Sequence, residues 1–283
     1  MTSAIRHQPN FQGALHRVDN REYSTYFYDK TATFAAEVIK NASTFIERIK
    51  DKFSPNHYCH NLSNKVTWKN DSQGLYLLVH GVNGHPCTWS EYFPAINRIH
   101  KNVDIIAPYV PSRGNCALKG ATSPILKLVN DYTQKNPGKP ICLIGASNGS
   151  RIVASIETQI GTDVSVKVAA IAGPFFGSKK MDFAKSTMAA SFLFTEAFVE
   201  ELSYNSEFGK KLVKDMSREE SPRNRYDFYV TKDDATVTPW QSGIPCLDKD
   251  ETITVYTGVG HSGIVTAAKS DIVTRCTAWM KSH

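Results

Sequence analysis

The chain has 283 residues, of which 41% are hydrophobic and 21% charged, a composition typical of a soluble globular protein rather than a disordered or fibrous one. Its formal net charge of +6 is spread along the chain without a block of like charge, so it does not indicate a nucleic-acid partner. Residues 1–14 lack the apolar run of a secretory signal, and no apolar stretch reaches the roughly 18 residues of a membrane span. We therefore expect a soluble, cytoplasmic protein without a transmembrane segment, and its oligomeric state stays open.

The first 70 residues carry an amphipathic pattern of their own. Between residues 24 and 53, apolar side chains recur at helical spacing: Phe27, Phe34, Ala35, Val38, Ile39, Phe45 and Ile49. This spacing predicts one or two helices packed outside the core, so we interpret residues 1–70 as an N-terminal helical extension. An antiparallel edge strand is possible at residues 65–69, because the turn residues Asn70 and Asp71 come directly after them.

From residue 71 to residue 283, short apolar runs alternate with longer amphipathic segments. The predicted strands are residues 75–79, 103–107, 141–145, 166–172, 226–231 and 252–256. The predicted helices are residues 89–100, 122–135, 148–159 and 262–281. Such alternation is typical of βαβ units, so we expect an α/β fold in which helices flank a mainly parallel sheet.

The sharpest chemical signal is Gly-Ala-Ser-Asn-Gly at residues 145–149. A Gly-x-Ser-x-Gly pentapeptide is common, but this one follows a predicted buried strand and opens a predicted helix. That context is typical of a nucleophile elbow, a tight turn that presents a serine hydroxyl. Glycines allow the turn because neighbouring segments can approach them closely. We therefore predict that Ser147 is a nucleophile.

A second loop, His-Gly-Val-Asn-Gly at residues 80–84, follows the apolar run 75–79. At the end of a strand beside the elbow, such a loop can direct a backbone N–H at a developing oxyanion. We expect the oxyanion hole to consist of the backbone amides of Val82 and Asn148, the residue after the nucleophile. His80 and His85 are expected to shape this loop rather than to act as bases.

The candidate base and its acid come later in the chain. His261 lies in a small-residue loop, residues 258–263, directly after the last predicted strand, and only His283 is a further histidine downstream of Ser147. The acid should lie between serine and base, because the fold that carries this elbow uses the order Ser, acid, His. Asp233 and Asp234 compete for this role, and both lie in the loop that follows the predicted strand 226–231.

Taken together, these motifs resemble the lipase and esterase members of the α/β-hydrolase superfamily. Those proteins carry, in this order, a Leu-Val-His-Gly strand end, a Gly-x-Ser-x-Gly elbow, an Asp-x-x-Val turn and a Gly-His loop. Asp234 with Val237 matches the Asp-x-x-Val pattern, whereas Asp233 does not. Residues 172–178 and 201–212 are similar to the Pro-x-x-Gly-Ser turn and the Leu-x-x-x-Ser-x-Phe helix of these lipases. The resemblance spans residues 75 to about 280, and it departs from the pattern at residues 231–233, Thr-Lys-Asp, where a glycine or alanine run is usual.

The resemblance implies the α/β-hydrolase fold and a catalytic triad of Ser147, His261 and Asp234 that cleaves carboxylic esters of small molecules or lipids. No metal or organic cofactor is required. Residues 179–225 are too long for a simple crossover, so we expect a helical cap over the serine. In this cap Phe192, Phe194 and Phe198 are the candidates for binding an apolar acyl chain, or they only pack the cap against the sheet.

The cysteines speak against a metal or redox function. All six are scattered along the chain without a C-x-x-C pair or metal-ligand spacing. The triad chemistry itself leaves alternatives open, because an acyltransferase, a thioesterase or a peptidase can use the same residues. A catalytically silent binding protein of this fold is the remaining alternative, and none of the three triad residues is missing here.

Overall fold

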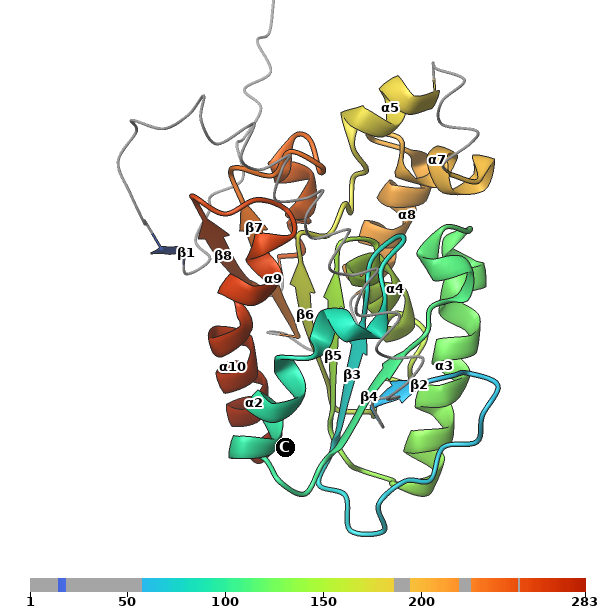
Figure 1. Cartoon of the computed structure of the whole chain (residues 1–283), viewed down its shortest axis with the longest axis vertical. Helices are drawn as coiled ribbons and strands as arrows, with labels where there is room; N and C mark the ends of the chain where they lie inside the picture. Colours follow the sequence, from blue (N-terminus) through green and yellow to red (C-terminus); the bar gives the residue numbers. More distant parts are fainter. Residues whose placement is uncertain (1–14, 19–57, 186–193, 219–224, 249) are drawn as a thin grey trace, which may run out of the picture.

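The computed structural model describes residues 15–18, 58–185, 194–218, 225–248 and 250–283 (Figure 1). These residues form an eight-stranded sheet in the order β1-β8-β7-β6-β5-β3-β4-β2, in which all neighbouring strands are parallel. The strands are β1 (Leu15–Val18), β2 (Cys59–His60), β3 (Leu75–Val79), β4 (Asp104–Pro108), β5 (Ile141–Ala146), β6 (Val166–Ile171), β7 (Tyr226–Thr231) and β8 (Thr252–Tyr256). The sequence-based expectation of a mainly parallel sheet is thus confirmed.

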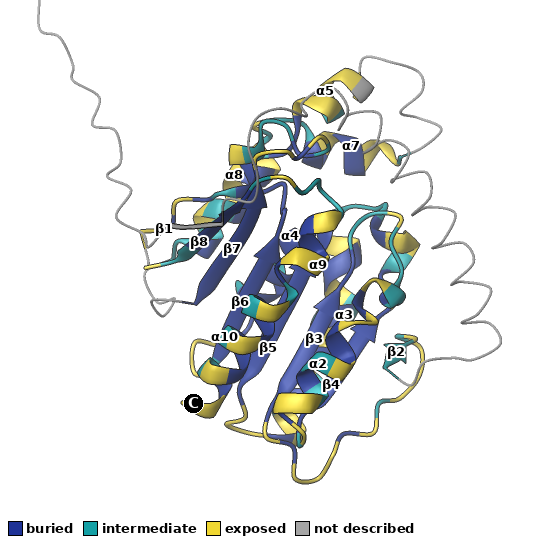
Figure 2. Cartoon of the chain, turned by 60° about the vertical axis from the view of Figure 1, so that its left-hand side comes forward, coloured by how far each residue is buried: buried dark blue, intermediate teal, exposed yellow. Residues whose placement is uncertain are grey.

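Helices cover both faces of the sheet, as Figure 2 shows, because the strands are apolar on both sides. Every residue of β3 is buried, and alternate residues join different cores. Leu75 and Leu77 belong to the cluster beneath α3 (Leu118–Lys135), α4 (Asn148–Glu157) and α8 (Glu207–Met216). Tyr76 and Leu78 belong to the cluster beneath α2 (Tyr92–Ile99), α9 (Gly263–Ala267) and α10 (Lys269–Lys281). Successive side chains of β3 therefore point alternately into the two hydrophobic cores, one on each face of the sheet.

The described parts of residues 179–225 are helical and lie beyond the ends of the strands, at the top of Figure 1. They comprise α5 (Lys179–Lys185), α7 (Glu196–Leu202) and α8. Thr195 caps α7 by accepting a hydrogen bond from the Phe198 amide at 3.3 Å, and Ser206 caps α8 by accepting one from the Gly209 amide at 3.2 Å. The described residues of this segment thus form helices as expected, and their position as a cap over Ser147 stays a prediction.

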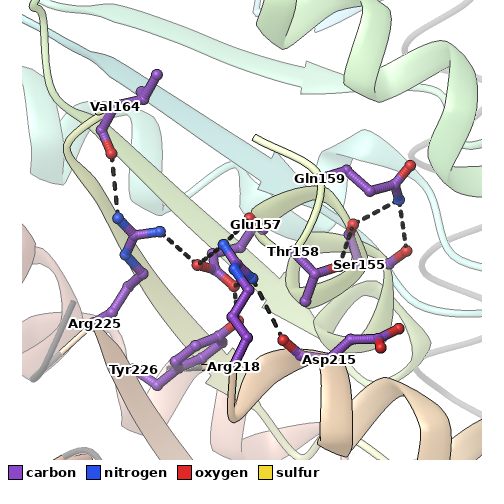
Figure 3. A network of polar contacts seen from close by, with 9 residues as sticks. All are labelled: Ser155, Glu157, Thr158, Gln159, Val164, Asp215, Arg218, Arg225 and Tyr226. Carbon is purple, nitrogen blue, oxygen red and sulfur yellow. Dashed lines mark hydrogen bonds and ion pairs between the residues drawn. The ribbon is translucent and has the colours of Figure 1, made fainter. Parts of the chain in front are cut away.

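A buried ion-pair network fastens the cap to the helix that follows the elbow (Figure 3). Glu157, at the end of α4, is fully buried. Its carboxylate accepts hydrogen bonds from Arg225 at 2.5 Å, from Arg218 at 3.1 Å and from the hydroxyl of Tyr226. Arg218 follows α8 and Arg225 precedes β7, so a single carboxylate holds both the exit of the cap and its return to the sheet. Removing one partner of such a buried pair is strongly destabilising.

Residues 65–69 do not form the antiparallel edge strand expected from the sequence. The edge is instead β2, which pairs parallel with β4. The reason lies in Trp68, which turns onto α3: its ring packs edge-on against Tyr132 at 5.0 Å, and its indole N–H donates to Asp131 at 2.7 Å. Burial of a large aromatic side chain on a helix here outweighs strand pairing.

Other boundaries also differ from the sequence-based expectation. Helix α3 begins at Leu118 rather than at residue 122, because the Glu201 carboxylate of the cap accepts the Leu118 N–H at 2.8 Å. The C-terminal helix is divided at Ala268 into α9 and α10. Residues 15–18 form β1, an edge strand that the sequence analysis did not expect. The helices expected over residues 24–53 lie outside the described residues, and the division at residue 70 stays a prediction.

Candidate active site

Ser147 lies in a sharp turn between β5 and α4. Its backbone dihedrals are φ 54° and ψ −127°, in a region that residues with a side chain rarely adopt. Its amide donates a hydrogen bond of 2.7 Å to the carbonyl of Ile171 on the neighbouring strand, and its carbonyl accepts the Ser150 N–H at 2.9 Å. The surrounding structure therefore holds a strained residue in place, a feature that concentrates at functional sites.

The two glycines of the elbow are required by close backbone contacts. A Cβ atom on Gly145 would lie 2.4 Å from the carbonyl oxygen of Gly149. A Cβ atom on Gly149 would lie 2.1 Å from the carbonyl oxygen of Val79, the last residue of β3. Neither position can accept a side chain without moving backbone. The glycines of the sequence motif thus bring β3, β5 and α4 together at the serine.

The loop after β3 lies directly against Ser147. A Cβ atom on Gly81 would come within 2.8 Å of the Ser147 Cβ, so the loop backbone contacts the serine side chain. Among the described residues, neither Val82 nor Asn148 donates its amide hydrogen to another backbone group. Asn148 is the first residue of α4, where an N–H has no partner within the helix. Their assignment to an oxyanion hole stays a prediction, with which this absence of backbone partners among the described residues is consistent.

His80 shapes this loop, as the sequence analysis expected. Its ring is 1% exposed, and both ring nitrogens make hydrogen bonds. Nε2 accepts the amide hydrogen of Val110 at 3.3 Å, so Nδ1 carries the ring proton and donates it to the carbonyl of Gly81 at 2.8 Å. His85 caps the short helix Pro86–Trp89 by accepting the Cys87 amide at 3.2 Å. Neither histidine contacts Ser147 in these interactions.

The loops after β7 and β8 bring an aspartate and a histidine together. Nδ1 of His261 lies 2.7 Å from Oδ2 of Asp234, and their side chains are 11% and 3% exposed. The other carboxylate oxygen, Oδ1, accepts the amides of Thr236 and Val237, each at 2.8 Å. Because an ionised carboxylate only accepts, Nδ1 is the protonated nitrogen of the imidazole. In the neutral form of this imidazole, Nε2 therefore carries no proton and is the nitrogen that can accept one.

Asp233 contacts the histidine loop without contacting the imidazole. Its exposed carboxylate accepts the Gly258 N–H at 2.7 Å. The neighbouring Thr231 is buried, and its hydroxyl donates to the carbonyl of Val259 at 2.6 Å. Both side chains therefore hold the loop that carries His261. Neither contact has a signal in the sequence, although each residue stands within three positions of the predicted acid.

The structure is similar to a group of solved hydrolases. A peroxisomal α/β-hydrolase of Saccharomyces cerevisiae matches with a TM-score of 0.53 and 12% identity, over 77% of this chain and 81% of that one. The chain has the α/β-hydrolase fold. Est1E from Butyrivibrio proteoclasticus (TM-score 0.51, 13% identity, 75% and 90% covered) and the Bacillus licheniformis lipase BlEst2 (0.51, 15%, 76% and 94%) are also similar. No family model and no curated protein matches the sequence.

Within this α/β-hydrolase fold, the turn at residues 174–178 supports the aspartate loop. Ser178 is 4% exposed, and its hydroxyl donates to the carbonyl of Thr236 at 2.8 Å while accepting the Thr238 N–H at 3.0 Å. The Ser178 hydroxyl thus holds the segment whose amides bind Asp234. In the sequence this Pro-x-x-Gly-Ser turn stands out only by its resemblance to lipases, and the structure shows a physical role for its serine.

The three phenylalanines expected to bind substrate differ in how much the structure says of them and in their burial. Phe192 lies outside the described residues. Phe194 and Phe198 stack on each other with ring centroids 5.4 Å apart, and Phe198, on α7, is only 2% exposed. Phe198 therefore packs within the cap, whereas Phe194 is half-buried. A role for either residue in substrate binding stays a prediction.

The described residues hold no group of three or more histidine, cysteine, aspartate or glutamate side chains that could bind a metal ion. All six cysteines are free thiols. In the same part of the chain, no helix is both long and apolar enough to cross a membrane.

Proposed function

We propose that this protein is a serine hydrolase that cleaves carboxylic esters through an acyl-enzyme intermediate. The observation that carries the proposal is the 2.7 Å contact between Asp234 and His261. The loops of Asp234 and His261 follow β7 and β8, and the strained Ser147 follows β5; since these strands are parallel, all three residues stand at the carboxyl end of the sheet. A carboxylate that orients an imidazole, with a serine at an elbow, is the arrangement that activates a hydroxyl nucleophile.

In the proposed reaction, Oγ of Ser147 attacks the ester carbonyl and loses its proton to Nε2 of His261. The carbonyl oxygen becomes negatively charged, and the amides of Val82 and Asn148 donate hydrogen bonds to it. The tetrahedral intermediate then collapses: the bond to the alkoxy group breaks, and His261 gives its proton to the leaving alcohol. Asp234 keeps the proton on Nδ1 throughout and stabilises the imidazolium while it exists.

Water completes the cycle by the same steps. His261 removes a proton from the water molecule as its oxygen attacks the acyl-serine carbonyl. Collapse of the second intermediate breaks the bond to Oγ, and the serine recovers its proton from His261. The products are a carboxylic acid and an alcohol. The ester and one water molecule are consumed, and the residues of the chain return to their starting state, so the steps balance.

We propose small-molecule or lipid esters with an apolar acyl group as the substrate class. The support is the aromatic composition of the cap, in particular the half-buried Phe194 stacked on Phe198. An apolar side chain of this kind suits an acyl chain better than a charged substrate.

Labelling with a fluorophosphonate and hydrolysis of p-nitrophenyl esters test the proposal. We expect the wild-type protein to be labelled and Ser147→Ala to lose both labelling and hydrolysis, because only the nucleophilic oxygen is removed. The matched control is Ser155→Ala, which removes a hydroxyl two turns further along α4, where it contacts Gln159 (Figure 3). Full labelling of Ser147→Ala would refute the serine-hydrolase proposal.

A further inference from the structure

The segment between β4 and α3 contacts the loop after β3, residues 80–84, which we call the oxyanion loop. We call residues 111–118 the bridging segment. The Arg113 carbonyl accepts the Asn83 N–H at 2.7 Å, and the Arg113 guanidinium donates to the carbonyls of Asn83 and, at 3.4 Å, of Gly84. A Cβ atom on Gly114 would lie 3.4 Å from Cα of Val82. The bridging segment therefore borders the residue whose amide we assign to the oxyanion hole.

The same segment is attached to the cap at two points. Oδ1 of Asn115 accepts the N–H of Thr195, the residue that caps α7, at 3.0 Å. The N–H of Leu118 donates to the carboxylate of Glu201, near the other end of α7, at 2.8 Å. The backbone is strained just before these contacts, because Ser112 and Arg113 have φ values of 49° and 54°. The bridging segment thus lies between the cap helix and the oxyanion loop.

Arg151 makes hydrogen bonds to both Asn148 and the cap helix α7. It stands one turn after Ser147 on α4 and is 1% exposed. Its guanidinium donates from Nη1 to the side-chain oxygen of Asn148 at 3.4 Å and from Nη2 to the carbonyl of Glu201 at 3.2 Å. The side-chain amide of Asn148 in turn donates to the carbonyl of Gly114 at 3.1 Å. A continuous series of hydrogen bonds therefore connects α7, Arg151, Asn148 and the bridging segment.

The burial of Arg151 is energetically unfavourable by itself. Within the described part of the chain, no carboxylate lies at ion-pair distance from its guanidinium, and burial lowers the pKa of this group to about 10 although Glu201 opposes the shift. Burying a cation without an ion pair carries a desolvation penalty that its hydrogen bonds must offset. Apolar residues often replace buried charges without loss of stability, which points to a geometric purpose for this guanidinium.

We propose that Arg151 is a positioning residue for the reaction described above: through Asn148 it holds the bridging segment, and with it the Val82 amide, where the oxyanion forms. The same guanidinium ties this place to the cap helix α7. The proposal rests on the proposed function. A planar guanidinium is suited to this role because it donates in two fixed directions at once, whereas a lysine ammonium is a single point charge.

Misplacing an oxyanion donor affects the transition state more than the bound substrate. Losing an interaction that is made only in the transition state lowers kcat and kcat/KM by the same factor and leaves KM unchanged. Deleting one donor outright lowers kcat by roughly 10²- to 10³-fold. We expect Arg151→Lys, which shifts a donor rather than deleting it, to lower kcat by roughly tenfold to a hundredfold with KM within about twofold of wild type.

The experiment compares Arg151→Lys with Arg225→Lys in the full chain. Arg225 is a similarly buried arginine, 3% exposed, that binds the far end of α4 through Glu157 (Figure 3). Both variants keep the charge and lose the guanidinium, so loss of stability alone should affect both. Rates on a p-nitrophenyl ester are normalised to active sites titrated with a fluorophosphonate. We expect kcat per titrated site to fall only in Arg151→Lys.

Each outcome decides the inference. An unchanged kcat per site in Arg151→Lys, or an equal fall in both variants, would overturn it, while loss of activity in Ser147→Ala would keep the proposed function. Labelling of Ser147→Ala would instead overturn the proposed function itself. If Arg151→Lys yields no folded protein, the exposed Arg113→Met decides: it removes the donors to Asn83 and Gly84, and an unchanged kcat there would refute the role of the bridging segment.

Discussion

The exchange of Asp234 for asparagine tests the proposed acid most directly. In the wild-type protein, Oδ1 of Asp234 accepts two backbone amides, and Oδ2 accepts Nδ1 of His261. The two backbone amides determine how an asparagine would orient, because its carbonyl oxygen must stay at the Oδ1 position. Its NH₂ group would then face the imidazole. Nδ1 would then have to accept a hydrogen bond from this NH₂ group, so the ring proton would move to Nε2. As a result, Nε2 could no longer take the proton of Ser147.

We expect Asp234→Asn to lower kcat by about four orders of magnitude, the loss that a wrong histidine tautomer causes, which corresponds to roughly 5.5 kcal/mol of transition-state free energy. The assay is p-nitrophenyl ester hydrolysis at pH 7.5, with circular dichroism to verify folding. The matched control is Asp233→Asn. Its asparagine keeps an oxygen that can accept the Gly258 amide, so kcat should change less than about tenfold.

Two results would refute this reasoning. An Asp234→Asn variant that keeps more than a tenth of the wild-type kcat would show that the carboxylate does not set the tautomer of His261. A four-order loss in Asp233→Asn would transfer the role of the acid to the neighbouring residue, and Ser147 and His261 would keep theirs.

Two further predictions concern the cap and pH. Medium or long acyl chains should be preferred over acetyl, with roughly 0.8 kcal/mol gained per buried methylene, in a p-nitrophenyl ester series; a strict acetyl preference would mean that Phe194 and Phe198 fill the pocket themselves. Burial lowers the pKa of His60 and His100, so the unfolded chain binds protons that the folded chain does not. The free energy of unfolding should therefore fall as the pH drops below the unfolded value of about 6.5. Urea denaturation at pH 7.5 and 5.5 measures this fall, which should be smaller in His100→Asn; an equal fall would contradict the assignment to His100.

The central strands could be predicted from the sequence, because their signal is local. Strands β3, β7 and β8 begin and end where the sequence predicts, since a strand buried on both faces is rich in apolar, β-branched and aromatic residues. The elbow was equally readable, because its glycines are dictated by backbone contacts at the turn itself. The order of motifs along the chain then suggested which aspartate and which histidine belong to the site.

The tertiary structure decided how those residues are held. Arg151, Ser178 and Thr231 are single polar residues without a sequence pattern, and each has a partner between 28 and 60 residues away along the chain. The early start of α3 and the orientation of Trp68 likewise depend on distant side chains, a cap carboxylate and a helix face. Periodicity reports which residues are buried and how the local backbone turns. It does not report which distant group will meet a buried polar atom, because topology sets that contact and burial then makes it obligatory.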